Sequence, residues 1–185
     1  MLEELMNNLE ADMQKVIDSL KREYATIRAG RANPALLEKV TVEYYGVPTP
    51  INQMANISAP EPRLLVIQPW DRSVIPSIEK AILKSDLGLN PTNDGSLIRI
   101  SIPQLTQERR NELVKVVRKK AEEFRVIIRN LRRDANDKIK KTEKEHGISE
   151  DESRKAIEQV QKLTDKHIEL IDKVLEKKEA EILEV

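Results

Sequence analysis

Residues 104–147, QLTQERRNELVKVVRKKAEEFRVIIRNLRRDANDKIKKTEKEHG, contain no proline and have their single glycine at the last position. Apolar residues recur through this stretch every three or four positions, which is the spacing of one buried face of an α-helix. The stripe comprises Leu113, Val116, Val117, Phe124, Ile127, Ile128, Leu131, Ala135 and Ile139. At a rise of ~1.5 Å per residue, the predicted helix is about 60 Å long. Because isolated helices are marginally stable in water, this one needs partners.

Two further stretches without proline or glycine, residues 1–29 and 148–185, supply those partners. Gly147 suits a left-handed helix end, and Ser149 with Glu152 has the Ser-x-x-Glu spacing of a capping box. So short a turn predicts an antiparallel helical hairpin, and the first helix can bury its stripe only along the same seam. These two stripes comprise Leu2, Leu5, Met6, Leu9, Met13, Val16, Ile17, Leu20, Tyr24 and Ile27, then Ala156, Val160, Leu163, His167, Leu170 and Val174, with His167 at the core edge.

All nine prolines and the other four glycines lie between Gly30 and Pro103. Segments 40–45, 63–67 and 97–102 are rich in β-branched and aromatic residues and are predicted strands, whereas segments 46–50, 60–62 and 90–95 are predicted turns. A short helix is expected over about 74–85.

The predicted fold class is therefore α+β: a long antiparallel three-helix bundle (domain I, residues 1–29 plus 106–185) with an inserted small β/α/β domain (domain II, residues 30–105). Two short connections join the insert to the bundle, and paired connections of this kind predict a hinge. The hinge residues are Gly30, Arg31, Ala32, Asn33, Pro34, Pro103, Gln104 and Leu105.

Composition excludes several classes of function. The 185 residues include no cysteine, two histidines and only 3% aromatic residues, which argues against disulfides, thiolate metal sites and a deep aromatic pocket. No phosphate-binding glycine loop, His-Glu-x-x-His or nucleophile elbow is present, so we expect no enzyme, no metal and no cofactor. The sequence lacks a signal peptide and a membrane-length apolar run, which predicts a cytoplasmic protein without a membrane partner.

The formal net charge is zero, yet the charge is unevenly distributed. Residues 106–146 hold 14 basic and 8 acidic side chains, a net charge of +6, whereas residues 1–29 hold 4 and 6 and residues 147–185 hold 7 and 11. A charged helix is commonly just a solvated surface. Asymmetry between segments nevertheless favours a polyanionic partner.

Four arginines of the central helix share one face. At 100° per residue, their positions fall within about 60° of one another, beside the apolar seam. Planar guanidinium groups in register suit a nucleic-acid backbone, but they would equally pair with the acidic flanking helices. The pattern leaves both interpretations open for Arg118, Arg125, Arg129 and Arg132.

Three more arginines lie near the predicted hinge. Arg28 and Arg31 lie at its first connection, and Arg110 lies at the start of the central helix. Cations at a helix C-terminus are often only partners of the helix dipole. A ligand-binding role is the second interpretation for this group.

Five segments, taken in order, resemble the bacterial ribosome recycling factor family over the whole chain. They are IRAGRANP (27–34), VEYYGVPTP (42–50), SDLGLNP (85–91), RNLRRDANDK (129–138) and QKLTD (161–165). The chain departs from the family pattern at Ala29 and Asn33, where Thr and Ser are frequent.

The resemblance implies an L-shaped molecule of about transfer-RNA dimensions, monomeric and without covalent chemistry of its own. It implies binding of the bundle to the rRNA of the large ribosomal subunit and separation of the subunits with elongation factor G and GTP. The family's rRNA-contacting arginines correspond to Arg129 and Arg132, and further to Arg28, Arg31 and Arg110. The alternative from another class is a helical structural adaptor, whose apolar stripes would pair with partner helices.

Overall fold

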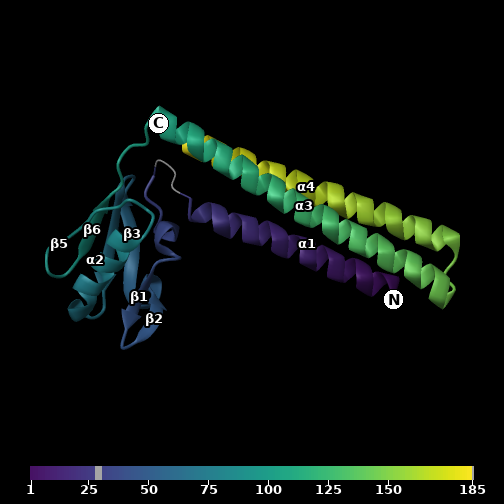
Figure 1. The fold of residues 1–185 in the computed structure, drawn as a ribbon, viewed down its shortest axis with the longest axis horizontal. Helices are drawn as coiled ribbons and strands as arrows, with labels where there is room; N and C mark the ends of the chain where they lie inside the picture. The colour runs from purple at the N-terminus through teal and green to yellow at the C-terminus, as the bar shows by residue number, and fades with distance from the viewer. Residues whose placement is uncertain (28–30, 185) are drawn as a thin grey trace. The chain divides into compact units, whose positions relative to one another are not determined.

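A computed structural model describes residues 1–27 and 31–184, and the chain divides into two compact units (Figure 1). Unit 1 comprises Met1–Arg22 with Glu112–Ala180, and unit 2 comprises Glu23–Asn111 with Glu181–Val185. Each unit therefore combines segments that are distant in sequence. The α+β class is confirmed, because long helices build unit 1 and a small antiparallel sheet with one helix builds most of unit 2.

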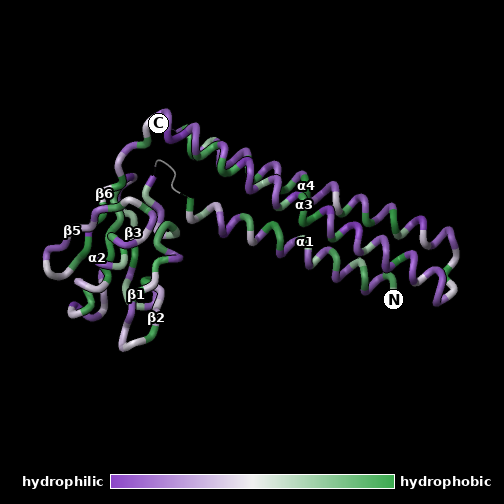
Figure 2. The backbone as a smooth tube through the Cα atoms, viewed as in Figure 1, coloured by the Kyte–Doolittle hydropathy of each residue, from purple (hydrophilic) through white to green (hydrophobic). Residues whose placement is uncertain are grey.

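The three predicted long helices are present as α1 (Leu2–Ala25), α3 (Gln107–His146) and α4 (Glu150–Leu183). Within unit 1 they lie side by side, with α3 antiparallel to the other two (Figure 1). Figure 2 shows hydrophobic residues recurring along the whole length of each helix. The bundle is thus stabilised along its length by one continuous seam.

The predicted start and stop signals of the helices act as expected. Thr106 Oγ1 accepts the backbone N–H of Arg109 at 3.1 Å, and Ser149 Oγ accepts that of Glu152 at 3.1 Å. Between α3 and α4, Gly147 has a φ of +68°, a left-handed conformation that favours glycine. The caps satisfy backbone N–H groups at the first turns of α3 and α4, and the tight turn at Gly147 makes the two helices antiparallel neighbours.

The apolar stripes pack against one another within the single chain, which leaves them unavailable to partner helices. Their side chains are fully buried at each level of the bundle, as in Met13, Ile17, Leu20, Val117, Ile128, Ile139, Val160 and Ile171.

The buried seam is narrower than the sequence predicted. Val116 and Ile127 are 45% and 42% exposed, although the next residue in each case is fully buried. Successive helical residues point about 100° apart, so only one of such a pair can face the seam.

On α4, Ala156, Val160 and His167 are buried as predicted, but at two positions the residue after the predicted one faces the seam. Thr164 and Ile171 are buried, whereas Leu163 and Leu170 are only partly buried. The hydroxyl of Thr164 donates to the carbonyl of Val160 at 2.8 Å, which satisfies its polar group inside the bundle.

His167 belongs to the core rather than to its edge, because it is 0% exposed. Its Nδ1 lies 2.7 Å from the carbonyl oxygen of Leu163, one helical turn earlier. That hydrogen bond compensates one of the two ring nitrogens for burial.

Unit 2 is built around a four-stranded antiparallel sheet in the order β3-β4-β6-β5. A separate hairpin is formed by β1 (Thr41–Tyr44) and β2 (Val47–Pro50). One helix packs into the core beside strand residues such as Leu65, Ile67, Ile98 and Ile100. The sheet strands and the helix are β3 (Ala55–Glu61), β4 (Leu64–Pro69), β5 (Pro91–Asn93), β6 (Ile98–Ser101) and α2 (Ile75–Lys84).

Three short 3-10 helices complete the unit: Pro34–Leu37, Ile51–Gln53 and Arg72–Val74. The predicted strands at 40–45, 63–67 and 97–102 correspond to β1, β4 and β6, and the predicted helix at 74–85 corresponds to α2.

Three proline-containing segments that were predicted as turns are wholly or partly strands. They hold β2, the end of β3, and β5. Proline cannot donate to a strand ladder and is therefore confined to edge positions. Each of these strands is an edge: β2 belongs to a two-stranded hairpin, and β3 and β5 are the outer strands of the sheet.

Candidate nucleic-acid interface

The four arginines that share a face of α3 are called here the arginine stripe: Arg118, Arg125, Arg129 and Arg132. All four lie in unit 1, and their environments differ. The side chain of Arg118 is 63% exposed, that of Arg129 is 40% exposed and that of Arg125 is 19% exposed. Arg132 is half-buried.

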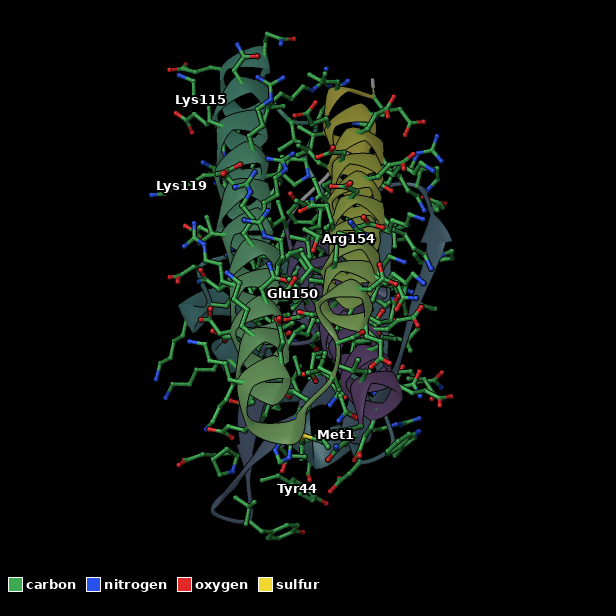
Figure 3. All side chains as sticks on the ribbon, turned by 90° about the vertical axis from the view of Figure 1, so that its right-hand side faces the viewer. Met1, Tyr44, Lys115, Lys119, Glu150 and Arg154 are labelled. Atoms are coloured by element: carbon green, nitrogen blue, oxygen red, sulfur yellow. The ribbon has the colours of Figure 1, made fainter. Side chains whose placement is uncertain are left out.

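Figure 3 views the bundle from the end that carries the α3–α4 turn and shows Lys115 and Lys119 extending from α3 on the side away from α4.

Arg125 is largely enclosed and links α3 to α4. Its Nε and Nη2 donate to Oδ1 of Asp172 at 3.0 and 2.6 Å, and its Nη1 donates to Oε2 of Glu122 at 3.1 Å. All three nitrogens of the guanidinium are thus engaged with carboxylates. This residue fits the structural interpretation, in which an arginine pairs with a flanking acidic helix.

Glu122 connects two members of the stripe. Its second carboxylate oxygen, Oε1, accepts Nη1 of Arg129 at 3.0 Å. Hydrogen bonds from Arg129, and next from Arg125, hold the pKa of Glu122 below its ordinary value. A lowered folded-state pKa means that the stabilisation is present above the pKa of the unfolded chain and is lost as the pH falls through the folded one. Glu122 is therefore charged at neutral pH.

Arg118 also pairs across the two helices. Its Nε donates to Oε1 of Glu179 at 2.6 Å, and this hydrogen bond raises the pKa of the arginine. Because Arg118 is largely exposed, the pair is screened by solvent and is weak compared with a buried one.

Arg132 has a different kind of partner. Its Nη1 donates to the amide oxygen Oε1 of Gln161 on α4 at 3.3 Å, and its buried Nε has no hydrogen-bond partner. Within residues 1–27 and 31–184, no carboxylate lies at salt-bridge distance from this guanidinium. Arg132 therefore retains a full positive charge that no neighbouring acid neutralises directly.

The arginines near the predicted hinge have separate environments. Arg31 is 69% exposed and pairs with Glu184 at 2.5 Å, and both residues belong to unit 2. Arg110 is only 7% exposed and its Nε lacks a hydrogen-bond partner. Arg28 lies outside the described residues. Arg31 and Arg110 both belong to unit 2, whereas the arginine stripe belongs to unit 1.

Two of the predicted hinge residues form hydrogen bonds with other residues of the insert. The N–H of Ala32 donates to the carbonyl of Pro62 at 2.6 Å, and the side chain of Asn33 accepts the N–H of Ala35 at 3.0 Å. Asparagine here caps the 3-10 helix Pro34–Leu37, a role that serine can also fill.

On the returning connection, Leu105 is buried whereas Pro103 and Gln104 are exposed. Gly30 lies outside the described residues.

The sequence pattern missed the groups that distinguish the four arginines. Glu122 was not among the predicted site residues, although it precedes Arg125 by three positions and Arg129 by seven and so lies beside both on α3. Asp172, Glu179 and Gln161 are on α4, 47, 61 and 29 positions away from their partners. No local signal identifies contacts at such separations.

Other kinds of site were also sought. In the part of the chain that the structure describes, no cluster of three or more histidine or acidic side chains could hold a metal ion. None of the described helices combines the length and the apolar character that crossing a bilayer requires.

Comparisons with known proteins all point to one family. The family model described as "Ribosome recycling factor" matches residues 20–183. The chain is 68% identical to the ribosome-recycling factor of Heliobacterium modesticaldum and 64% identical to that of Carboxydothermus hydrogenoformans, in both cases over 100% of each chain.

Two solved structures are similar over nearly the whole chain. One is a solution structure of the ribosome recycling factor, with 49% identity, a TM-score of 0.78 and coverage of 100% of this chain and 98% of that chain. The other presents models for the Thermus thermophilus ribosome recycling factor and the Escherichia coli elongation factor G bound to the E. coli post-termination complex. It has 52% identity and a TM-score of 0.70, with 99% of each chain covered.

Proposed function

Because the chain belongs to the ribosome recycling factor family, we propose that it is a translation factor that acts on the post-termination ribosome. In this proposal it binds the large ribosomal subunit and, with elongation factor G and GTP hydrolysis on that partner, separates the two subunits. The full-length match to named relatives, through both units, carries the proposal.

The arginine stripe supplies the physical basis for RNA binding. Arginine presents a planar set of donors that suits phosphate, and a helix that displays several in register can follow a nucleic-acid backbone. Phosphate contacts position a protein on RNA whatever the base sequence. The proposed rRNA contacts are Arg129 and Arg132 first, with Arg110, Arg28 and Arg31 as further candidates and Arg125 and Arg118 last.

The proposed mechanism assigns separate roles to the two predicted domains. The bundle (residues 1–29 plus 106–185) anchors the protein on rRNA and transmits force as a stiff lever. The insert (residues 30–105) receives the push of the elongation factor, and the two connections at 30–34 and 103–105 act as the joint. Continuous burial along the helical seam supports the stiffness of unit 1, because a close-packed core transmits strain.

The proposal assigns no covalent step to this protein. Its sequence has no Gly-x-x-x-x-Gly-Lys loop to hold a nucleotide, so GTP hydrolysis is assigned to the partner. We also propose that the protein works as a monomer, since its apolar helical stripes are buried within one chain.

The direct test is dissociation of purified post-termination complexes, followed by light scattering. We expect this protein, a cognate elongation factor G and GTP together to separate the subunits, and any pair of these components to fail. A complete mixture that leaves the complexes intact would refute the proposed function.

The Glu122 bridge provides a second test, directed at RNA binding. Replacing Glu122 with glutamine removes the carboxylate held by Arg129, while Asp172 continues to hold Arg125. We expect the variant to bind isolated large subunits several-fold more tightly, with a salt dependence steeper by about one unit, because one more guanidinium is free for phosphate. Binding is measured by co-sedimentation at several salt concentrations.

The matched control is Glu123→Gln, which removes the same charge from the next residue of α3. Glu123 is exposed and forms no hydrogen bond or ion pair within the described residues. If the loss of one negative charge only reduced the general repulsion between the protein and RNA, both variants would gain affinity equally. Equal affinities for the two variants would therefore show that the Glu122 bridge does not restrain Arg129.

A further inference from the structure

Gln161 on α4 is the one neutral side chain that holds a member of the arginine stripe, within the residues that the structure describes. Its Oε1 accepts Nη1 of Arg132 at 3.3 Å, whereas the other three members donate to carboxylates. Gln161 and Arg132 are 29 positions apart in sequence, so the contact depends on the pairing of α3 and α4.

The orientation of the Gln161 amide follows from its two neighbours. Its Nε2 donates to Oδ1 of Asp165, one helical turn later, at 2.9 Å. An ionised carboxylate only accepts hydrogen bonds and a guanidinium only donates them. The amide nitrogen must therefore face Asp165 and the amide oxygen must face Arg132, so Asp165 fixes which end of Gln161 meets the arginine.

The immediate surroundings of Arg132 favour a ligand outside the described chain. Its Nε is buried without a hydrogen-bond partner, and Gln161 engages only one of its terminal nitrogens. A half-buried stem limits the rotamers of the side chain, which reduces the entropy lost when the guanidinium binds an anion. A neutral acceptor orients the group and leaves its charge available.

We propose that Gln161, oriented by Asp165, is a positioning residue that presents the Arg132 guanidinium to an rRNA phosphate without neutralising it. This inference rests on the proposed function, and specifically on binding of the bundle to large-subunit rRNA. A carboxylate at position 161 would compete with the phosphate for the same guanidinium. The neutral amide of Gln161 holds the guanidinium in place and does not compete with the phosphate for its positive charge.

The decisive variant is Gln161→Glu, which preserves the shape of the side chain and adds the competing charge. We expect its affinity for isolated large ribosomal subunits to fall about 10-fold and its salt slope to decrease by about one unit. In the Arg132→Ala background, the same replacement should cause little further loss. Co-sedimentation over a series of salt concentrations measures both quantities.

Gln159→Glu is the matched control. It adds the same charge to the same helix two residues earlier, about 160° around the helix axis. The side chain of Gln159 is exposed and forms no hydrogen bond within the described residues. A general repulsion of RNA by added negative charge would lower binding of both variants equally. That result would overturn the proposal.

Two further variants separate positioning from folding and from contact with Asp165. In the double variant Gln161→Glu with Asp165→Asn, the carboxylate introduced at position 161 no longer faces a carboxylate at position 165. If Gln161→Glu alone impairs folding, the double variant should fold normally. Its weak binding to large subunits should nevertheless persist. Gln161→Leu removes the acceptor without adding charge, and we expect about a 3-fold loss of affinity with an unchanged salt slope. Recovery of wild-type binding by the double variant would contradict the proposal.

Failure of this inference is distinguishable from failure of the proposed function. If Arg132→Ala weakens binding and Gln161→Glu behaves like its control, only the positioning role of Gln161 is refuted. If the unaltered protein fails to bind large subunits at all, the proposed function is refuted and this inference with it.

Discussion

Replacing Arg132 with alanine is expected to lower the affinity of the protein for large ribosomal subunits by about 10- to 100-fold while leaving the helices intact. Hydrogen bonds to charged groups contribute about 1.5–3 kcal/mol each, and ~1.4 kcal/mol corresponds to a factor of ten. The salt dependence of binding should decrease by about one unit, because one fewer counterion is released from RNA. Co-sedimentation at several salt concentrations gives both values, and far-UV circular dichroism monitors the helices.

Arg133→Ala is the control for this experiment. It removes the same charge from the next residue of α3, which is exposed, lies about 100° around the helix and makes no hydrogen bond or ion pair within the described residues. A role for the stripe predicts a much smaller loss for this variant. Unchanged binding of Arg132→Ala, or an equal loss for both variants, would refute the assignment of Arg132 as an RNA contact.

The second large effect is expected on stability, from Ile128→Ala in the bundle core. Ile128 is 0% exposed at the seam of α3, and truncating such a side chain leaves a cavity that costs about 2–5 kcal/mol. The urea midpoint for loss of helical circular dichroism should fall accordingly. Trp70 is the only tryptophan of the chain and lies in unit 2, so its fluorescence reports separately on that unit.

The adjacent Ile127 supplies the matched comparison for this experiment. It is 42% exposed, and its replacement with alanine removes the same atoms from the same helix. Alanine is also the better helix former, so we expect a change within about 1 kcal/mol. Similar losses for Ile127→Ala and Ile128→Ala would mean that the bundle does not bury α3 along the seam described here.

The arginine stripe illustrates how one sequence pattern can contain residues with different roles. Four guanidinium groups share a face, yet Arg125 is held by carboxylates on two elements and serves to join α3 to α4. Arg132 meets only an amide. Arg125 therefore fits the structural interpretation, whereas RNA binding by Arg132 stays a prediction, and we expect the effects of replacing the two residues to differ correspondingly.

Local sequence signals were sufficient for the helices and for strands β1, β4 and β6. A helix is defined by contacts three or four residues apart, and its ends by caps such as Thr106, Ser149 and Gly147, so both can be recognised in a short window. The strands with branched side chains were found for the same reason. Strands β2, β3 and β5 were missed because their prolines resemble turn signals until the position of each strand in the sheet is known.

The sequence by itself determined the α+β class, the three long helices, the position of the arginines on one face of α3 and the resemblance to a family. Only the tertiary structure decided which isoleucine faces the seam, that His167 is fully buried, and which partner each arginine meets. The spacing of side chains on one helix follows from its own geometry. Contacts between helices depend on their axial register and rotation, which arise when distant stripes pack together and are encoded by no single segment.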